Sequence, residues 1–171
     1  MRELFSLDLK NYKEDGFIFR RPSARAIIIK DGRLALIHSL KYDYYKFPGG
    51  GIDKGETNEQ ALVREVMEEA GLAVIPESIK EFGYVCRKNK GKFSDDEIFI
   101  QENFYYTCEV EDGVSFQDLD DYEEEERFTL EYVTPEEAIE ANRKSVKNQD
   151  GGKIMIERET RVLEIIKSEL M

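Results

Sequence analysis

The sequence predicts a single α+β domain with a mixed β-sheet, in which strands and helices are interspersed along the chain. Runs rich in β-branched and aromatic residues lie between turn signals, which is typical of strands. Two threonines precede segments with a helical apolar period, which is typical of capped helices. The chain has 171 residues, of which 40% are hydrophobic, and this is enough for one domain with a core. We therefore expect one domain over residues 1–171.

Charge and composition exclude several classes of protein. The formal net charge is −12, from 25 basic and 37 acidic residues, so the surface repels nucleic-acid backbones. An anionic small molecule would need a metal ion or a local basic pocket. Cys86 and Cys108 lack metal-site spacing and are interpreted as buried thiols. No apolar run has the length of a signal peptide or a membrane span, so we expect a cytoplasmic protein with no membrane or nucleic-acid partner.

The first third of the chain favours strands. Residues 1–20 are interpreted as an N-terminal arm or short strands, with one short strand at 16–20. A β-branched strand over 24–30 and its partner over 33–39 are joined by Asp31-Gly32, a strong hairpin signal. Residues 40–47 are predicted to be a polar, tyrosine-rich loop. Pro48 and the three glycines after it indicate backbone that approaches other groups closely.

A helix is predicted to begin at Thr57. Thr57 and Gln60 form a capping-box pair. One apolar face is expected from residues spaced as on a helix, which are Val63, Val66, Met67 and Ala70. Gly71 occupies the position of a left-handed C-terminal cap, and Pro76 prevents the helix from continuing.

The second half of the chain predicts strands and then helices. Strands are expected at 79–88, 98–110 and 128–134, with a turn at 89–92 and an acidic loop at 117–126. Thr134 and Pro135 begin a helix that runs to about Arg143. The chain then breaks at 148–152. An amphipathic terminal helix over 153–170 is expected to pack on the domain.

Three glutamates share one face of the predicted helix at 57–70. Glu65, Glu68 and Glu69 are neighbours there, because residues three and four apart lie side by side on a helix. Their mutual repulsion costs roughly 0.2–0.5 kcal/mol per pair. A hard divalent cation with oxygen ligands would neutralise them. On spacing alone, a solvated charged face remains the alternative.

The glutamates belong to a longer pattern, which resembles the box of the Nudix hydrolase family, MutT-like proteins included. That family's pattern is G-x5-E-x7-R-E-U-x-E-E-x-G-U, where U is aliphatic. Residues 50–72 match its seven fixed positions and both aliphatic ones. The fixed residues are Gly50, Glu56, Arg64, Glu65, Glu68, Glu69 and Gly71. The resemblance covers roughly 24–142 and implies the Nudix fold, a mixed β-sheet sandwiched between α-helices (α/β/α).

The resemblance also implies roles for individual residues. Glu65, Glu68 and Glu69 would hold Mg²⁺, for which Mn²⁺ is a substitute, with the Gly50 or Gly49 carbonyl as a further ligand. Arg64 would orient a glutamate of the box. Glu56 would lie behind the ligands or act as an outer ligand; otherwise it is a helix-start carboxylate favoured by the dipole. The catalytic base would be Glu125 or Glu126 from the run 123–126, or else Glu65 itself.

Substrate recognition is the least defined part of the sequence. The basic residues nearest the expected site are Arg25, Lys46, Arg87 and Lys88, and the aromatic ones are Tyr44, Tyr45 and Phe47. Arg25, Tyr45 and Phe47 are the substrate-binding candidates, because aromatic rings can stack on a ligand ring. The resemblance implies Mg²⁺-dependent hydrolysis of the diphosphate linkage in a nucleoside diphosphate joined to another moiety.

A MutT-like nucleoside triphosphate pyrophosphatase is one version of this reading, and an ADP-ribose or nucleotide-sugar pyrophosphatase is another. A non-catalytic Nudix-fold ligand sensor is the alternative from a different class. Binding-only relatives often lose metal glutamates, which are all present here. The sequence leaves open a homodimer formed through the N-terminal arm or the terminal helix.

Overall fold

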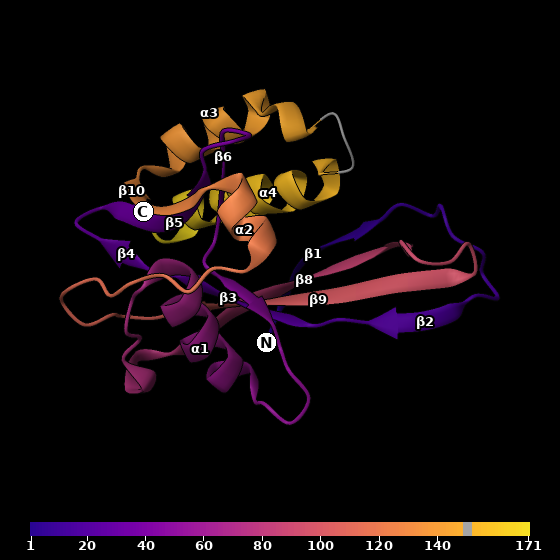
Figure 1. Cartoon of the computed structure of the whole chain (residues 1–171), viewed down its shortest axis with the longest axis horizontal. Coiled ribbons are helices and arrows are strands. Elements are labelled where there is room, and N and C mark those ends of the chain that lie inside the picture. The colour runs from indigo at the N-terminus through magenta and orange to yellow at the C-terminus, as the bar shows by residue number, and fades with distance from the viewer. Residues whose placement is uncertain (149–151) are drawn as a thin grey trace.

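The computed structural model describes residues 1–148 and 152–171 (Figure 1). Helix α1 (Asn58–Ala70) lies on one side of the strands, and α3 (Pro135–Lys144) and α4 (Lys153–Glu169) lie on the other. Two hydrophobic clusters match this arrangement, since one contains the buried face of α1 and the other that of α3 and α4. The expected α+β class with a mixed sheet between helices is confirmed.

The larger sheet contains the glycine-rich segment as one of its edge strands. Its order is β1-β8-β9-β3-β7, and β2 pairs with the outer half of β9. The strands are β1 (Glu3–Asp8), β2 (Phe17–Arg20), β3 (Ser23–Ile27), β7 (Gly49–Gly51), β8 (Lys80–Lys90) and β9 (Glu97–Thr107). Parallel and antiparallel pairs both occur, so the sheet is mixed.

The smaller sheet contains a strand where the sequence predicted a loop. Its order is β10-β5-β4, with β6 on the other edge of β5. The strands are β4 (Ile29–Lys30), β5 (Arg33–Ser39), β6 (Tyr44–Lys46) and β10 (Phe128–Val133). The predicted loop at 40–47 was wrong for β6, which is entirely buried. Its tyrosine and lysine side chains look polar in sequence, but the structure gives each of them an internal partner.

The predicted strand over 24–30 divides between the two sheets. Its first part is β3, and the chain then passes through Ile28 into β4. The glycine-rich segment forms β7 at the edge of the larger sheet, paired antiparallel with β3. Gly49 has a φ of 133°, and a Cβ there would overlap the carbonyl oxygen of Ala24. The expected close approach of the backbone is therefore confirmed, as a strand rather than a loop.

Helix α1 has the predicted ends but a rotated inner face. The Gln60 amide donates to Thr57 Oγ1 at 3.2 Å, and Gly71 caps the helix with a φ of 66°. The buried residues are Ala61, Leu62, Val66, Glu69 and Ala70, whereas Met67 is exposed. The expected apolar position of Met67 was wrong, because the buried Glu69 has internal partners that turn this acidic position inward.

The C-terminal half corrects one further prediction. The acidic stretch at 117–126 ends in a short helix, α2 (Asp121–Glu126), where a loop was predicted. Single 3₁₀ turns occur at Pro76–Ser78 and Val146–Asn148. The predicted break at 148–152 falls largely on residues 149–151, which lie outside the described residues. Within residues 1–148 and 152–171, no helix is long and apolar enough to span a membrane.

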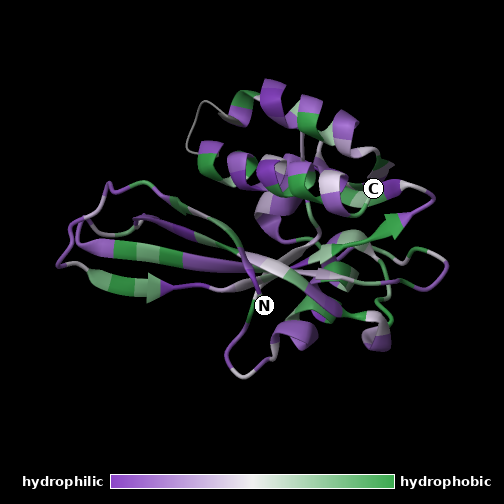
Figure 2. Ribbon diagram, turned by 180° about the vertical axis from the view of Figure 1, so that it is seen from behind, coloured by the Kyte–Doolittle hydropathy of each residue, from purple (hydrophilic) through white to green (hydrophobic). Residues whose placement is uncertain are grey.

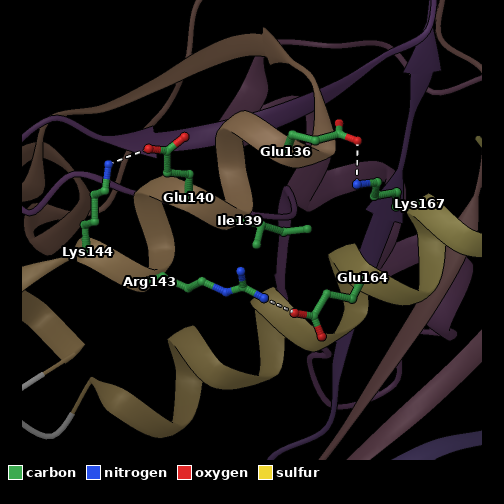
Figure 3. Close-up of a pocket in the computed structure, with 7 residues that line it drawn as sticks. All are labelled: Glu136, Ile139, Glu140, Arg143, Lys144, Glu164 and Lys167. Carbon is green, nitrogen blue, oxygen red and sulfur yellow. Dashed lines mark hydrogen bonds and ion pairs between the residues drawn. The ribbon is translucent and has the colours of Figure 1, made fainter.

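Helices α3 and α4 are held together across a groove of about 490 Å³ (Figure 3). Two ion pairs cross it, Lys167 with Glu136 at 2.7 Å and Arg143 with Glu164 at 2.7 Å. Each charged side chain drawn in this groove has an ion-pair partner there, so we interpret the groove as a helix–helix contact. Figure 2 shows a second surface feature, the hydrophobic strand β2 at the end of the larger sheet, where Phe17, Ile18 and Phe19 are exposed.

Candidate active site

A carboxylate-rich pocket of about 330 Å³ lies where β7, α1 and the segment before α2 meet. Its lining comprises Arg21, Gly51, Asp53, Arg64, Glu65, Glu68, Glu69, Asp118, Leu119, Asp120 and Glu123. Seven of these side chains are acidic and two are basic. The pocket therefore has a strong excess of negative charge, which favours a bound cation.

Arg64 gathers the carboxylates at the mouth of this pocket. Its Nε and Nη2 each donate to one oxygen of Glu56 at 2.8 Å. Its Nη1 donates to Glu65 at 2.8 Å and to Glu68 at 3.1 Å, and Nη2 also reaches the Gly51 carbonyl at 3.1 Å. The hydrogen bonds from Arg64 and from the Asp53 amide lower the pKa of Glu56 to about 2. Arg64 thus contacts Glu56, Glu65 and Glu68 at once, and the orienting role of Arg64 and the outer place of Glu56 stay predictions.

Glu65 lies directly against the bare backbone of β7. A Cβ at Gly50 would overlap the Glu65 carboxylate, so a larger residue there would displace this side chain. Burial raises the pKa of Glu65, and the Arg64 guanidinium opposes that shift. The carboxylate and the Gly50 backbone are therefore adjacent, and their sharing of one metal ion stays a prediction.

Glu69 is the most deeply placed acid of the pocket, with a side chain 2% exposed. Its Oε2 accepts a hydrogen bond from the Gly49 amide at 2.9 Å. Its Oε1 forms an ion pair with Lys46 Nζ but no hydrogen bond of ordinary geometry. Desolvation raises the pKa of Glu69, while the charges of Lys46 and Arg25 oppose the shift.

The segment before α2 is fastened to the last turn of α1. The amide of Ser115 donates to the Gly71 carbonyl at 2.7 Å, and that of Asp118 to the Glu68 carbonyl at 2.7 Å. Gln117 Nε2 donates to the Glu69 carbonyl at 2.6 Å. These bonds satisfy carbonyls that a helix end leaves open. They also hold Asp118, and the acids that follow it, beside the glutamates of α1.

The acidic run contributes Glu123 to the pocket, not Glu125 or Glu126. Glu123 accepts from the Asp120 amide at 3.0 Å and from the Tyr122 hydroxyl at 2.8 Å. Glu125 is exposed and pairs with Lys41 at 2.5 Å. The preference for Glu125 or Glu126 is thus corrected, because the helical register of α2 directs these residues elsewhere.

Glu126 points away from the pocket and contacts other parts of the core. It accepts hydrogen bonds from the Tyr44 hydroxyl at 2.6 Å and from Ser39 Oγ at 3.2 Å. Lys147 forms an ion pair with its other oxygen. Glu126 therefore acts as an internal anchor between α2, β5 and β6.

None of the expected substrate-binding residues lines the pocket. Arg25 Nη1 donates to the carbonyls of Phe47, at 3.3 Å, and Gly49. Tyr45 stacks on His38 with ring centroids 4.2 Å apart, and its hydroxyl donates to Glu131 at 2.8 Å. Phe47 is completely buried. The rings of Tyr45 and Phe47 are already packed in the protein, so their predicted stacking on a ligand is corrected.

Sequence reasoning missed several residues of the pocket. Arg21 lines it beside Gly51, and its guanidinium has no ion-pair partner among the described residues. Asp118 and Asp120 enter the pocket from the segment before α2. A single arginine at a strand break and two acids in an acidic stretch carry no motif. Asp118 and Asp120 are distinguished only by the packing of their segment on α1, and Arg21 only by its position beside Gly51.

The donor set fits a hard divalent cation. Oxygen donors from carboxylates are the ligands that Mg²⁺ prefers, and Mg²⁺ keeps several of its waters. Glu69 Oε1 is buried without a hydrogen bond, and Gly50 leaves bare backbone beside Glu65. In the described part of the chain, no three such side chains converge tightly enough to hold an ion as they stand. Arg64 and Lys46 contact their oxygens instead.

These features define a class of protein that can bind an anionic ligand through a divalent cation, between a glycine strand and an acidic helix. A family model described as the NUDIX domain matches residues 19–152. The chain belongs to the NUDIX family.

Comparison with known proteins adds curated relatives. The RNA pyrophosphohydrolase of Aeromonas hydrophila is 42% identical over 59 residues, covering 34% of this chain and 32% of that protein. The U8 snoRNA-decapping enzyme of Homalodisca vitripennis is 30% identical over 94 residues, covering 48% and 50%. The chain thus spans only a third to a half of the length of these relatives.

Solved structures share the fold. The NUDIX hydrolase of Nitrosomonas europaea superposes with a TM-score of 0.55 at 17% identity, covering 82% of this chain and 89% of that one. A MutT NUDIX hydrolase of Burkholderia pseudomallei gives a TM-score of 0.50 at 22% identity, covering 69% and 85%. The Nudix fold expected from the sequence is confirmed.

Proposed function

We propose that this chain is a hydrolase that cleaves the diphosphate linkage of a nucleoside diphosphate joined to another moiety, with Mg²⁺ as cofactor and Mn²⁺ as a substitute. One observation carries the proposal: the acids of α1 face the bare glycine strand β7 across one pocket. Glu65 lies against Gly50, and Glu69 accepts a hydrogen bond from Gly49. Glycine backbone admits a diphosphate, and the acids supply the charge that holds a cation beside it.

Glu65, Glu68 and Glu69 would hold the cation, with the Gly50 carbonyl as a further donor. A bound divalent ion withdraws charge from the diphosphate and lowers the pKa of a water molecule. Arg64 fixes the orientation of Glu65 and Glu68 through its rigid fork. Glu56 holds Arg64 in turn, at two oxygens.

A proton acceptor for the attacking water must lie in the same pocket. Glu123 is the acid of α2 that lines it, and its two hydrogen bonds fix the carboxylate in place. We assign Glu123 this role, with Glu65 as the alternative, because both are pocket acids with defined orientations.

Binding of the substrate's ring needs an aromatic residue outside the core. Phe116 is 96% exposed, although the backbone on both sides of it is tied to α1 through Ser115 and Asp118. An exposed ring on a segment whose backbone is held against α1 is suited to stacking on a base. Phe116→Ala is therefore expected to raise KM for the preferred nucleotide more than it lowers kcat.

The test is a panel assay of phosphate and pyrophosphate release. The substrates are nucleoside triphosphates, ADP-ribose, nucleotide sugars and dinucleoside polyphosphates, each with Mg²⁺ and with a chelator. Turnover that requires Mg²⁺ and is lost in Glu68→Gln supports the proposal. Turnover that survives chelation or the substitution contradicts it. Binding without turnover by the wild type would support the sensor alternative.

The curated relatives favour a second candidate substrate, an RNA with a 5′ triphosphate. Two of them are named for acting on RNA. The net charge of −12 disfavours contact with a long backbone, so only the 5′ end would bind. A short triphosphorylated RNA in the same panel decides between the candidates: faster turnover of the RNA than of the matching free nucleotide favours the RNA.

A further inference from the structure

Lys46 places a positive charge against Glu69, one of the acids that line the pocket proposed to bind a cation. It is the last residue of β6, and its side chain is 9% exposed. Its Nζ forms an ion pair with Glu69 and lies 4.3 Å from the centroid of the Phe128 ring. A buried ammonium group is costly unless it is paired, so Glu69 is its main compensation.

The protein engages both oxygens of Glu69 before any ligand arrives. The Gly49 amide donates to one oxygen, and Lys46 is paired with the other. A divalent ion that approaches Glu69 therefore meets a second cation at the same carboxylate. The two positive charges repel each other, and this repulsion is strong where water is excluded.

Lys46 differs from Arg64 in how it serves the site. Arg64 bridges Glu56, Glu65 and Glu68 at the pocket mouth. Among the described residues, Lys46 has an ion pair with Glu69 alone. Its effect on a bound cation can therefore be measured through that one carboxylate.

We infer that Lys46 is an internal counter-ion that competes with the divalent cation for Glu69 and so sets the metal affinity of the site. The inference rests on the proposed metal site and adds a positioning residue to it. Lys46 holds the buried Glu69 carboxylate in place when the site holds no metal. The same charge makes the metal bind less tightly and leave more readily.

The test is metal binding, measured by calorimetric titration of Mn²⁺ and Mg²⁺ into the whole chain. Methionine has about the length of lysine and no charge, so Lys46→Met removes the competitor. We expect Kd for both ions to fall about tenfold, a typical size for coupling between two sites. Lys46→Arg keeps the charge and should keep the wild-type Kd. Lys46→Gln repeats the neutral comparison if the methionine variant does not fold.

A matched control is available elsewhere in the chain. Lys147 pairs with Glu126 and lies 5.2 Å from the Tyr44 ring centroid. It does not line the pocket, and in the described part of the chain it pairs with none of the acids that do. Lys147→Met should leave both Kd values unchanged. In a Glu69→Gln background, the effect of Lys46→Met should be smaller, because the two residues are coupled.

The outcomes separate this inference from the proposed function. If the wild type binds the ions but neutral substitutions of Lys46 leave Kd unchanged or raise it, the inference is overturned and the metal site stands. An effect as large in the Glu69→Gln background as in the wild type also overturns it. If the wild type binds neither ion, the proposed function fails first.

Discussion

At the scale of the residue, the site depends on which carboxylate oxygens each basic side chain contacts. Arg64 makes five hydrogen bonds to four residues, which a flexible ammonium group cannot reproduce. Of the three motif glutamates on α1, Glu68 has the most exposed side chain, whereas Glu69 is enclosed. The three glutamates of one motif therefore have three different environments.

Lysine at position 64 keeps the charge but loses the fork. We expect Arg64→Lys to lower kcat about 10- to 100-fold, the usual cost of losing a group that orients metal ligands. Steady-state kinetics with the preferred substrate measures this. Arg143→Lys is the control, because Arg143 pairs with Glu164 at the surface, and it should leave kcat unchanged.

Arg21 is the pocket cation without an acidic partner among the described residues. An arginine fork suits a phosphate group, so Arg21→Ala should raise KM about tenfold, within the range for a lost charge-assisted hydrogen bond. Arg20→Ala is the neighbouring control, since Arg20 pairs with Glu102 instead. Equal effects of the two substitutions would contradict a specific phosphate contact.

Glu56 makes folding stability depend on pH in a defined window. Its pKa is about 2 in the folded protein and 4.5 without these contacts, so its carboxylate stabilises the fold above pH 4.5. That contribution falls as pH drops from 4.5 toward 2, where both states become protonated. The difference in unfolding free energy between wild type and Glu56→Gln should therefore be constant at neutral pH and shrink across this window. Urea unfolding at a series of pH values measures it, and a difference that persists at pH 2 would contradict the assignment.

At the scale of the element, the end of α1 determines where the acidic segment lies. Gly71 combines a left-handed φ with a close contact to the Ser115 carbonyl, which a Cβ would overlap. The hydrogen bonds of Ser115, Gln117 and Asp118 continue this contact toward the pocket. The helix cap therefore has a second role, which is to position the segment that carries Asp118 to Glu123.

Gly71→Ala tests this second role. The left-handed conformation costs roughly 1–2 kcal/mol for a residue with a Cβ. Gly32→Ala meets the same cost, because its φ is 71°, but its Cβ would lie in open space. Gly32→Ala should lose about that much stability and Gly71→Ala more, because its Cβ also overlaps the Ser115 carbonyl; only Gly71→Ala should lower kcat. Unfolding curves and kinetics on the two proteins measure this, and equal kcat in both would exclude the positioning role.

Sequence reasoning succeeded for elements with local signals and failed where the signal was tertiary. The starts of α1 and of α3 follow from capping boxes that neighbouring residues form. β6 was missed because the side-chain partners of Tyr44, Tyr45 and Lys46 lie 82, 86 and 23 residues away along the chain. α2 was missed because a run of acids is usually solvated, whereas Glu123 and Glu126 here have internal partners.

At the scale of the whole molecule, the pocket joins parts of the chain that are distant in sequence. Arg21 precedes β3, Glu65 lies on α1, and Glu123 lies on α2. The acids repel one another when no cation is bound. A ligand that binds only the folded state stabilises it by mass action.

Mg²⁺ should therefore raise the melting temperature of the protein. At a concentration 100 times Kd the shift should be roughly 5–10 °C, from about 2.7 kcal/mol of stabilisation in a domain of this size. Scanning calorimetry with and without MgCl₂ measures it. Glu68→Gln should show a much smaller shift, and Glu125→Gln, outside the pocket, should keep it. A full shift in Glu68→Gln would contradict the proposed ligand set.

The sequence by itself determined the α+β class, the capped acidic helix and the resemblance to the Nudix family, because these depend on spacing between near neighbours. Only the tertiary structure decided which acid of the run 123–126 faces the pocket, that Tyr45 and Phe47 are enclosed, and that Lys46 is paired with Glu69. These facts depend on helix register, strand pairing and burial, through which distant segments meet. The burial of Lys46 cannot be read from the sequence, and it is this burial that gives the charge of Lys46 a strong influence on the site.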